Sequence, residues 1–201
     1  MHSLPWILGV LAALLHAAGY VTYNIQSKKK DSTPNTVSWF IWALMAGLNL
    51  SSFAQITDIP HALQYVVGTI AAIVTFILAL YWRRFAWPEP IEWFVLVFCL
   101  ITMGLWGTFK DASIANAFVL FFPLLGSIWP TFDGVRRDPF KETSLAWWIW
   151  TAAFAVNLLN NALSWNDKWM SVVNPIVLLV CHGSIAWLSR EARKRRFASS
   201  N

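Results

Sequence analysis

Apolar residues run along this chain in long blocks that are separated by short polar stretches. A helix that crosses a membrane needs about 20 predominantly apolar residues, because each residue adds only about 1.5 Å to its length. The chain divides into such blocks almost without remainder. The predicted spans are residues 4–23, 37–57, 61–82, 91–109, 112–132, 145–164 and 170–189. The pattern therefore predicts an all-α integral membrane protein with seven transmembrane helices.

The composition supports this interpretation. Hydrophobic residues make up 57% of the chain and charged residues only 12%, whereas about 25% of the residues of a soluble domain are charged. The first block differs from a cleaved signal peptide, because no Lys or Arg precedes it and no small-residue cleavage pattern follows it. Both cysteines lie inside predicted spans, so no disulfide framework or cysteine-rich metal motif is predicted.

The basic residues alternate between the two sides of the predicted spans. All Lys and Arg residues except Lys110 and Lys168 fall on one side. Because cytoplasmic loops retain Lys and Arg, the N-terminus is predicted to lie outside and the C-terminus inside. The basic residues have no aromatic or glycine-rich binding module around them, so nucleic acid is not a predicted partner.

A shift of 108 residues aligns the second predicted span with the sixth. The aligned pairs include Trp39 with Trp147, Trp42 with Trp150, and Asn49 with Asn157. The same shift carries the first span onto the fifth and the third onto the seventh, and it leaves the fourth unpaired. The predicted parts are a first three-helix bundle (1–88), a linker helix (89–111), a second bundle (112–190) and a basic cytoplasmic tail (191–201). The two bundles are expected to run parallel, about an axis along the membrane normal.

The two aligned blocks, "KKKDSTPNTVSWFIWALMAGLNLSSF" and "RRDPFKETSLAWWIWTAAFAVNLLNN", resemble the SWEET sugar transporters and the wider PQ-loop superfamily. The resemblance implies two triple-helix bundles around a linker helix and transport by alternating access. The Pro-Gln dipeptide that names the superfamily is absent from both repeats, and the expected hinge proline of the first helix occurs only in the second half, as Pro123. Bacterial nicotinamide-riboside transporters share the plan, so a nucleoside-like solute stays an alternative to a sugar.

Two asparagines are predicted at the middle of the membrane. Asn49 lies ten residues beyond Trp39, or about 15 Å into a hydrocarbon layer roughly 30 Å thick. Trp42 shares a helix face with Asn49, and Trp150 shares one with Asn157. The amides are suited to bind hydroxyl groups while the indoles cover the apolar faces of a sugar or base. The alternative is that each amide joins two helices by a hydrogen bond.

Further candidates lie at a similar depth. His16 and His182 are each twelve residues into their spans, where an ionisable group is either functional or a neutral ring bonded to a neighbouring helix. Asn174 shares a face with His182, and Pro175 frees a backbone carbonyl nearby. The predicted solute-binding residues are therefore His16, Trp42, Asn49, Trp150, Asn157, Asn174 and His182, and the predicted hinges are Pro123 and Pro175.

The chain lacks any Asp or Glu near the middle of a span, which favours uncoupled, facilitated transport. It also lacks an HExxH zinc pair, paired central carboxylates and a recognisable nucleophile beside a base, so an enzyme, a metal site and a cofactor are not predicted. We predict a transporter of a small neutral polar solute in the inner membrane of a bacterium. A non-transporting receptor or scaffold is the alternative function, and association into a homo-oligomer is left open.

Overall fold

The helices of the computed structural model follow the predicted apolar blocks. Residues 3–32, 36–82, 90–138, 140–165 and 167–199 are described, and they contain no strand. The elements are α1 (Ser3–Lys28), α2 (Thr36–Phe53), α3 (Ile59–Tyr81), α4 (Pro90–Trp106), α5 (Ala112–Val119), the π-helix η1 (Leu120–Leu124), α6 (Leu125–Arg137), α7 (Ser144–Leu163) and α8 (Met170–Ser199). The all-α class is confirmed for the described residues.

Four helical segments are long and apolar enough to cross a membrane. They are Ser3–Lys28, Ile59–Tyr81, Ala112–Arg137 and Met170–Arg190. The helix Pro90–Trp106 is also apolar but shorter. Length and composition therefore fit a membrane-embedded protein.

The surface is apolar and the interior carries amides, which is the reverse of a soluble protein. Ile70, Phe94 and Val97 are among many large apolar side chains that are more than half exposed. Asn116 and Asn174, by contrast, are completely buried. Such a surface is suited to contact with lipid, and the buried amides must find partners inside the bundle.

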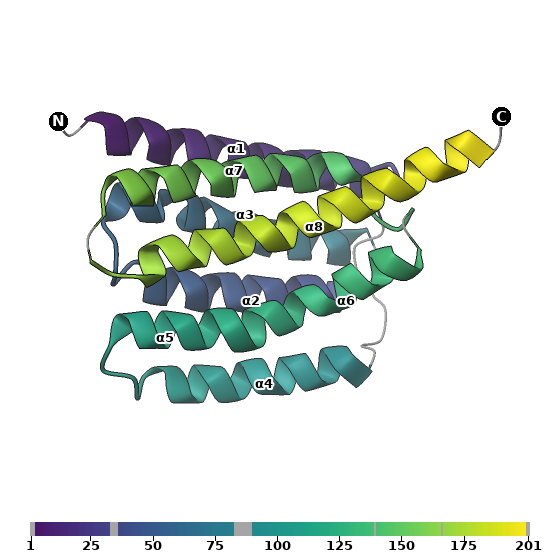
Figure 1. Cartoon of the computed structure of the whole chain (residues 1–201). Coiled ribbons are helices and arrows are strands. Elements are labelled where there is room, and N and C mark those ends of the chain that lie inside the picture. Colours follow the sequence, from purple (N-terminus) through teal and green to yellow (C-terminus); the bar gives the residue numbers. More distant parts are fainter. Residues whose placement is uncertain (1–2, 33–35, 83–89, 139, 166, 200–201) are drawn as a thin grey trace.

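Successive long segments run in opposite directions, so the connections lie at two ends of the bundle (Figure 1). One end holds residues 28–32, residues 136–138 and 140–143, and the C-terminal half of α8; we call it the basic end. The described basic residues there include Lys28, Lys29, Lys30, Arg136, Arg137 and Lys141. The predicted domain boundary at residues 88 and 89 and the side chains of the predicted tail lie outside the described part of the chain.

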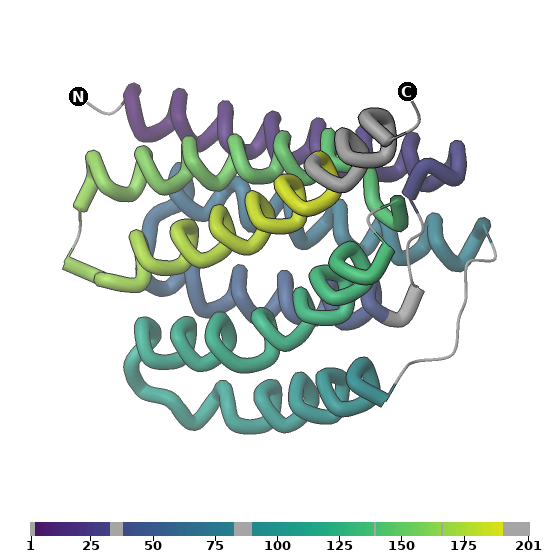
Figure 2. Tube along the Cα trace, turned by 45° about the vertical axis from the view of Figure 1, so that its right-hand side comes forward, coloured from purple at the N-terminus to yellow at the C-terminus, as the bar shows by residue number. Residues whose placement is uncertain are grey.

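We call α1 to α3 the first half of the bundle and α5 to α8 the second half, and the helices of the two halves pack in the same order. α3 packs against α1 and α2, and α8 packs against α6 and α7. The halves meet where α1 contacts α7 and where α2 contacts α5 and α6. Figures 1 and 2 both place α4 at the opposite edge from α1, where it contacts α2, α5 and α6.

Two glycines let α1 approach its neighbours closely. A Cβ atom on Gly19 would collide with the indole of Trp150, and one on Gly68 would lie 2.7 Å from His16 Nε2. Small residues at such contacts allow membrane helices to pack backbone against side chain. The absence of a side chain at these positions therefore fixes the spacing of α1 from α7 and α3.

The segment from Ala112 to Arg137 contains a local change of helix type. Asp111 caps its start, since its carboxylate accepts a hydrogen bond of 2.9 Å from the Ile114 amide. Eight α-helical residues are followed by the π-helix η1, which contains Pro123. Proline lacks the amide hydrogen that an α-helix needs, so a wider turn at this point is a physical consequence of the sequence.

Candidate functional site

A small cavity lies between the two halves, and we call it the central cavity. Four of the predicted residues line it, namely His16, Trp42, Asn49 and His182. The other lining residues are Tyr20, Ala46, Tyr65, Gly68, Thr69, Leu124, Phe154 and Leu178. The lining thus comes from α1, α2, α3, η1, α7 and α8.

One wall of the central cavity is backed by a set of linked amides. Asn49 Oδ1 accepts hydrogen bonds from Asn116 Nδ2 at 3.0 Å and from Asn174 Nδ2 at 2.7 Å. Asn174 Nδ2 also donates to Asn116 Oδ1 at 2.8 Å. Asn116 Nδ2 donates to Ser52 Oγ at 2.8 Å, and the Tyr65 hydroxyl donates to Asn174 Oδ1 at 3.1 Å. These five residues, the amide network, join α2, α3, α5 and α8.

The amide network leaves one donor of Asn49 for the cavity. The network uses the Oδ1 atom of Asn49, and the hydrogen bonds among the described residues do not use its Nδ2 atom. Asn49 itself lines the central cavity. The predicted role of Asn49 as a solute-binding residue is therefore compatible with its surroundings, and Asn174 lies one layer behind it.

Asn157 has different contacts from Asn49, although the 108-residue shift aligns the two. Its Nδ2 atom donates to the His61 carbonyl on α3 at 2.9 Å, and its Oδ1 atom accepts from Asn161 Nδ2 at 3.0 Å. Asn160 makes a similar contact to the Pro5 carbonyl on α1, at 3.1 Å. These amides hold α7 to α1 and α3, which is the alternative role that the sequence left open for Asn157.

The two aligned tryptophans make matching contacts between the halves. Trp42 Nε1 on α2 donates to the Ser127 carbonyl on α6 at 3.0 Å. Trp150 Nε1 on α7 donates to the His16 carbonyl on α1 at 3.2 Å. Each bond joins the second helix of one half to the first helix of the other. Trp42 is partly buried and lines the central cavity, while Trp150 is buried behind His16.

Both histidines are held by a hydrogen bond at Nδ1. His182 Nδ1 lies 2.7 Å from the Leu178 carbonyl, which can only accept, so a neutral ring carries its proton on Nδ1 and keeps Nε2 as an acceptor. His16 Nδ1 lies 3.0 Å from the side-chain amide of Gln64. The Nε2 atom of His182 is therefore left as an acceptor in the lining of the central cavity.

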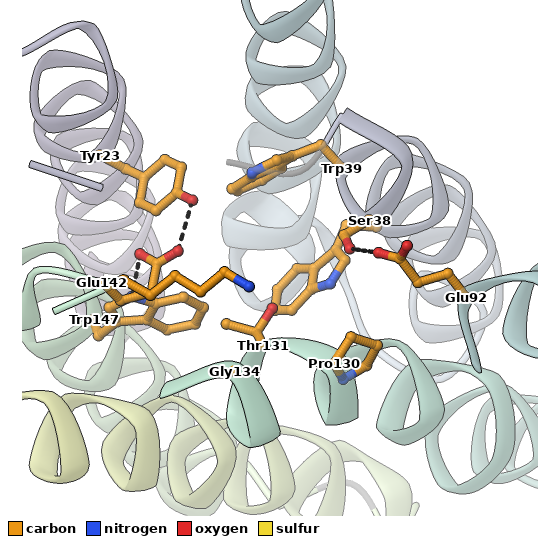
Figure 3. A pocket seen from close by; sticks show the side chains of 11 residues that line it. Tyr23, Ser38, Trp39, Glu92, Pro130, Thr131, Gly134, Glu142 and Trp147 are labelled. Atoms are coloured by element: carbon orange, nitrogen blue, oxygen red, sulfur yellow. Dashed lines mark hydrogen bonds between the residues drawn. The ribbon is translucent and has the colours of Figure 1, made fainter. Parts of the chain in front are cut away.

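A second small cavity opens at the basic end (Figure 3), and we call it the basic-end cavity. Trp42 lines both cavities. Two carboxylates face it although they are almost completely buried, Glu92 with 2% of its surface exposed and Glu142 with 5%. Ser38 Oγ donates to Glu92 at 2.5 Å.

Glu142 joins α1 to the start of α7. The Tyr23 hydroxyl donates to its Oε1 atom at 3.1 Å, and Trp147 Nε1 donates to its Oε2 atom at 3.2 Å. Burial raises the pKa of the Glu142 carboxyl to about 7, because a charge is poorly solvated there, and the two donated hydrogen bonds oppose this rise. A carboxyl group that titrates near neutral pH therefore lies between the two halves.

The predicted hinge residues lie inside helices. Pro123 is buried in η1, and Pro175 is inside α8. Pro123 lies in a π-turn, whose geometry differs from that of the α-helices on either side. Single π-turns within α-helices are often found at functional sites. α8 continues through Pro175 without a change of helix type.

Sequence reasoning missed Asn116, Tyr65 and the buried carboxylates. Asn116 is an amide inside a predicted apolar span, so the criterion that selected Asn49 also applied to it. Tyr65 and Glu142 carried no such signal, because nothing in the linear pattern shows that a tyrosine contacts an amide or that a loop carboxylate is buried. Within the described residues, no group of three or more His, Cys, Asp or Glu side chains is arranged to hold a metal ion.

Comparison with known proteins gives no relative for this chain. No family model matches it, and neither the curated proteins nor the solved structures contain a match. The resemblance to SWEET transporters therefore depends on the sequence pattern alone.

Proposed function

We propose that this protein is a SWEET-like transporter that moves a small neutral polar solute through the central cavity by alternating access. In this proposal the chain crosses the inner membrane of a bacterium seven times, with its N-terminus outside and its basic end in the cytoplasm. The observation that carries the proposal is the central cavity between the two halves, lined by Asn49 with its Nδ2 donor unused among the described residues.

The arrangement of the halves supports a parallel repeat. Trp42 in the first half donates a hydrogen bond to the Ser127 carbonyl in the second half. Trp150, at the matching position of the second half, donates one to the His16 carbonyl in the first half. The contacts of α1 with α7 and of α2 with α5 are related in the same way. In transporters built from repeats, the solute binds near the midplane between the two units, which rock against each other.

The π-helix at Pro123 supports a moving second half. Its wider turn lies next to the central cavity, since Leu124 belongs to both. The Trp42 indole is bonded to the Ser127 carbonyl, one turn beyond Pro123. A change of helix geometry at Pro123 would therefore move a wall of the cavity and release the Trp42 contact together.

The chemistry of the cavity favours a neutral solute. The described residues that line it carry amide, hydroxyl and imidazole groups, and none of them is Asp, Glu, Lys or Arg. Hydrogen bonds to uncharged groups suit hydroxyls, and the rings of Tyr20, Trp42 and Phe154 can cover the apolar face of a sugar or a base. A mono- or disaccharide is the first candidate, and a nucleoside-like compound is the second.

Uptake into proteoliposomes tests this function. Labelled glucose, sucrose and nicotinamide riboside are compared for wild type, Asn49→Ala and Asn157→Ala at equal amounts of folded protein. We expect Asn49→Ala to reduce kcat/KM about tenfold, because one hydrogen bond to the solute is lost. Asn157→Ala is expected to lower the melting temperature and to leave KM close to wild type, since Asn157 holds α7 to α3.

The same experiment separates this function from its alternative. Uptake that is equal in wild type and Asn49→Ala would contradict the role of Asn49. Wild-type protein that binds a solute or a partner but moves none of the three compounds would favour a receptor or scaffold. The bond of Asn157 to a helix backbone is the feature that such a non-transporting protein would share.

A further inference from the structure

A larger groove lies at the basic end, between the start of α4 and the last turns of α6. Its volume is about 520 Å³, which is within the range typical of small-molecule sites, and we call it the interfacial groove. The described residues that line it include Ile91 of α4, the face of α6 from Trp129 to Arg137, and Lys141 beyond α6. Trp129 and Arg137 are more than half exposed, and α4 lies at an edge of the bundle (Figures 1 and 2). The groove therefore opens toward the surroundings of the protein.

One face of α6 carries both apolar and charged lining of the groove. Trp129, Asp133 and Arg137 follow one another at four-residue spacing, which places their side chains on one side of a helix. The Trp129 indole stacks on Phe132, with ring centroids 5.9 Å apart, and Ile91 adds an apolar side chain from α4. Trp129 lies about 12 Å along the helix axis from Arg137. The face is therefore charged at the end of α6 and apolar about two turns farther in.

Positive charge exceeds negative charge at the end of α6. Asp133 Oδ1 accepts hydrogen bonds from Arg136 Nε at 3.3 Å and from Arg136 Nη2 at 3.2 Å. Arg137 Nη2 contacts the other oxygen of the same carboxylate. Two guanidinium groups thus share one carboxylate. The Arg137 side chain is 72% exposed, so its other N–H groups can reach a ligand in the groove.

Lys141 brings a further cation over this face of α6. Its Cδ and Nζ atoms lie 3.5 Å from the point where a Cβ atom on Gly134 would be. Because Gly134 has no side chain, the stem of the lysine can lie close to the helix backbone. Asp138 also lines the groove, so three basic side chains stand against two acidic ones, and one positive charge remains.

We propose that the interfacial groove binds one molecule of an anionic phospholipid, whose phosphodiester lies between Arg137 and Lys141 and whose acyl chains run along Trp129. A guanidinium group presents N–H donors in a fork that matches phosphate oxygens, and a lysine adds a mobile positive charge. Basic pockets between helices at a membrane surface bind lipid headgroups in this way. The single negative charge of a phosphodiester also matches the positive charge that remains at the groove.

The length of the groove suits a lipid better than a free phosphate compound. The headgroup layer on each side of a bilayer is about 5–8 Å thick. A lipid with its phosphate at Arg137 therefore has its acyl chains at the depth of Trp129, about 12 Å along the helix. The site goes beyond the proposed transport and uses neither Asn49 nor the central cavity.

Native mass spectrometry of the purified full-length protein, freed of copurified lipid, tests the proposal. Dioleoyl phosphatidylglycerol is the anionic probe, and dioleoyl phosphatidylcholine and phosphatidylethanolamine carry the same acyl chains without net charge. Glycerophosphoglycerol, which is the anionic headgroup without acyl chains, is the competitor. We expect one phosphatidylglycerol to bind about fivefold more tightly than either neutral lipid, and glycerophosphoglycerol to leave it bound even at large excess.

Substitutions separate the charge of the groove from its shape. Arg137→Gln and Lys141→Gln should each weaken phosphatidylglycerol binding about fivefold, because one attraction to the phosphate is lost. Lys29→Gln removes an exposed charge from the same end outside the groove, so it should leave the affinity unchanged. Gly134→Leu keeps every charge but fills the groove, so it should also weaken binding while the melting temperature shows that the protein is folded.

The alternative occupants give different results. Equal affinity for phosphatidylglycerol and phosphatidylcholine, or tighter binding of phosphatidylethanolamine, would overturn the anionic site. Displacement by glycerophosphoglycerol would assign the groove to a soluble phosphate compound and refute the lipid. Unchanged affinity in both Arg137→Gln and Lys141→Gln, or in folded Gly134→Leu, would contradict binding in this groove. Arg137 and Lys141 are exposed, so their replacement leaves the core intact, and Asn49→Ala should bind phosphatidylglycerol like wild type whether or not a solute is transported.

Discussion

Glu142 shows how the environment of one side chain can set a response to pH. Its carboxylate accepts from Tyr23 and Trp147, and both of these partners are buried. Trp147 can only donate, so a proton on Glu142 is best placed on the oxygen that faces Tyr23, whose hydroxyl can turn and accept. Protonation therefore preserves both contacts while it removes a buried charge.

We expect the stability of the protein to fall as the pH rises toward 8. Burial raises the pKa of Glu142 in the folded protein from its ordinary value of 4.5 to about 7. The stabilisation is thus fully present below about pH 4.5 and is lost as the pH rises through 7. It amounts to about 3 kcal/mol. Unfolding in detergent between pH 4 and 9 measures this effect.

The matched variant for this measurement is Glu142→Gln, which cannot ionise. Its free energy of unfolding should lose the slope between pH 5 and 8 that wild type shows. A wild-type slope that persists unchanged in Glu142→Gln would assign the titration to another group.

The individual polar contacts of the site were only partly predictable from the sequence. Helical rise placed Asn49 at mid-depth, and the structure puts it in the lining of the central cavity. The same reasoning gave Asn157 an equal depth but could not supply its partner, because the His61 carbonyl belongs to another helix. A repeat fixes position along an axis, whereas hydrogen bonds depend on how neighbouring helices are rotated.

The closest helix contacts depend on glycine, and this gives a test of the packing. Gly19→Ala places a methyl group into the Trp150 indole, so it should lower the free energy of unfolding by about 1–3 kcal/mol. Gly47 on α2 is the control, since a Cβ atom there meets nothing within 4 Å. Gly47→Ala should stabilise the helix by about 0.5–1 kcal/mol. Equal effects of the two substitutions on the melting temperature would contradict the close contact of α1 and α7.

The π-helix leads to a prediction about motion. Pro123→Ala restores an amide hydrogen and allows a regular α-helix through residues 120–124. We expect the variant to be more stable by about 1–3 kcal/mol and to transport solute several times more slowly, because the proposed rocking motion would lose the wider turn on which it depends. Both quantities are measurable, by thermal unfolding and by uptake into proteoliposomes.

Pro130→Ala is the control for this variant. Pro130 is also inside the segment from Ala112 to Arg137, but it lies in regular α-helix. The Pro130→Ala variant should be stabilised in a similar way, while its transport rate should stay close to that of wild type. Faster or unchanged uptake in Pro123→Ala would contradict a hinge at that position.

The helices themselves followed from the sequence more closely than their contacts did. Long apolar blocks predicted each helical segment, and the structure extends α1 from the predicted end at residue 23 to Lys28. The extension is polar, so hydropathy alone could not include it. The π-turn within the fifth predicted span also escaped prediction, because Pro123 indicated a bend without indicating its type.

The molecule as a whole has two chemically different ends. The described connections that carry Lys28, Lys29, Lys30, Arg136, Arg137 and Lys141 lie together at the basic end in Figure 1. The opposite end carries the N-terminus and the connections from α2 to α3, α4 to α5 and α7 to α8. If Lys and Arg are retained in the cytoplasm, these two ends face different compartments.

Cysteine labelling measures which compartment each end faces. In a background with Cys99 and Cys181 replaced by alanine, Thr108→Cys and Asp31→Cys place single thiols at exposed positions of opposite ends. We expect a membrane-impermeant maleimide to label Thr108→Cys on intact bacterial cells and to label Asp31→Cys only after the membrane is permeabilised. Labelling of both thiols from outside would contradict the seven-span topology, and the reverse pattern would place the N-terminus in the cytoplasm.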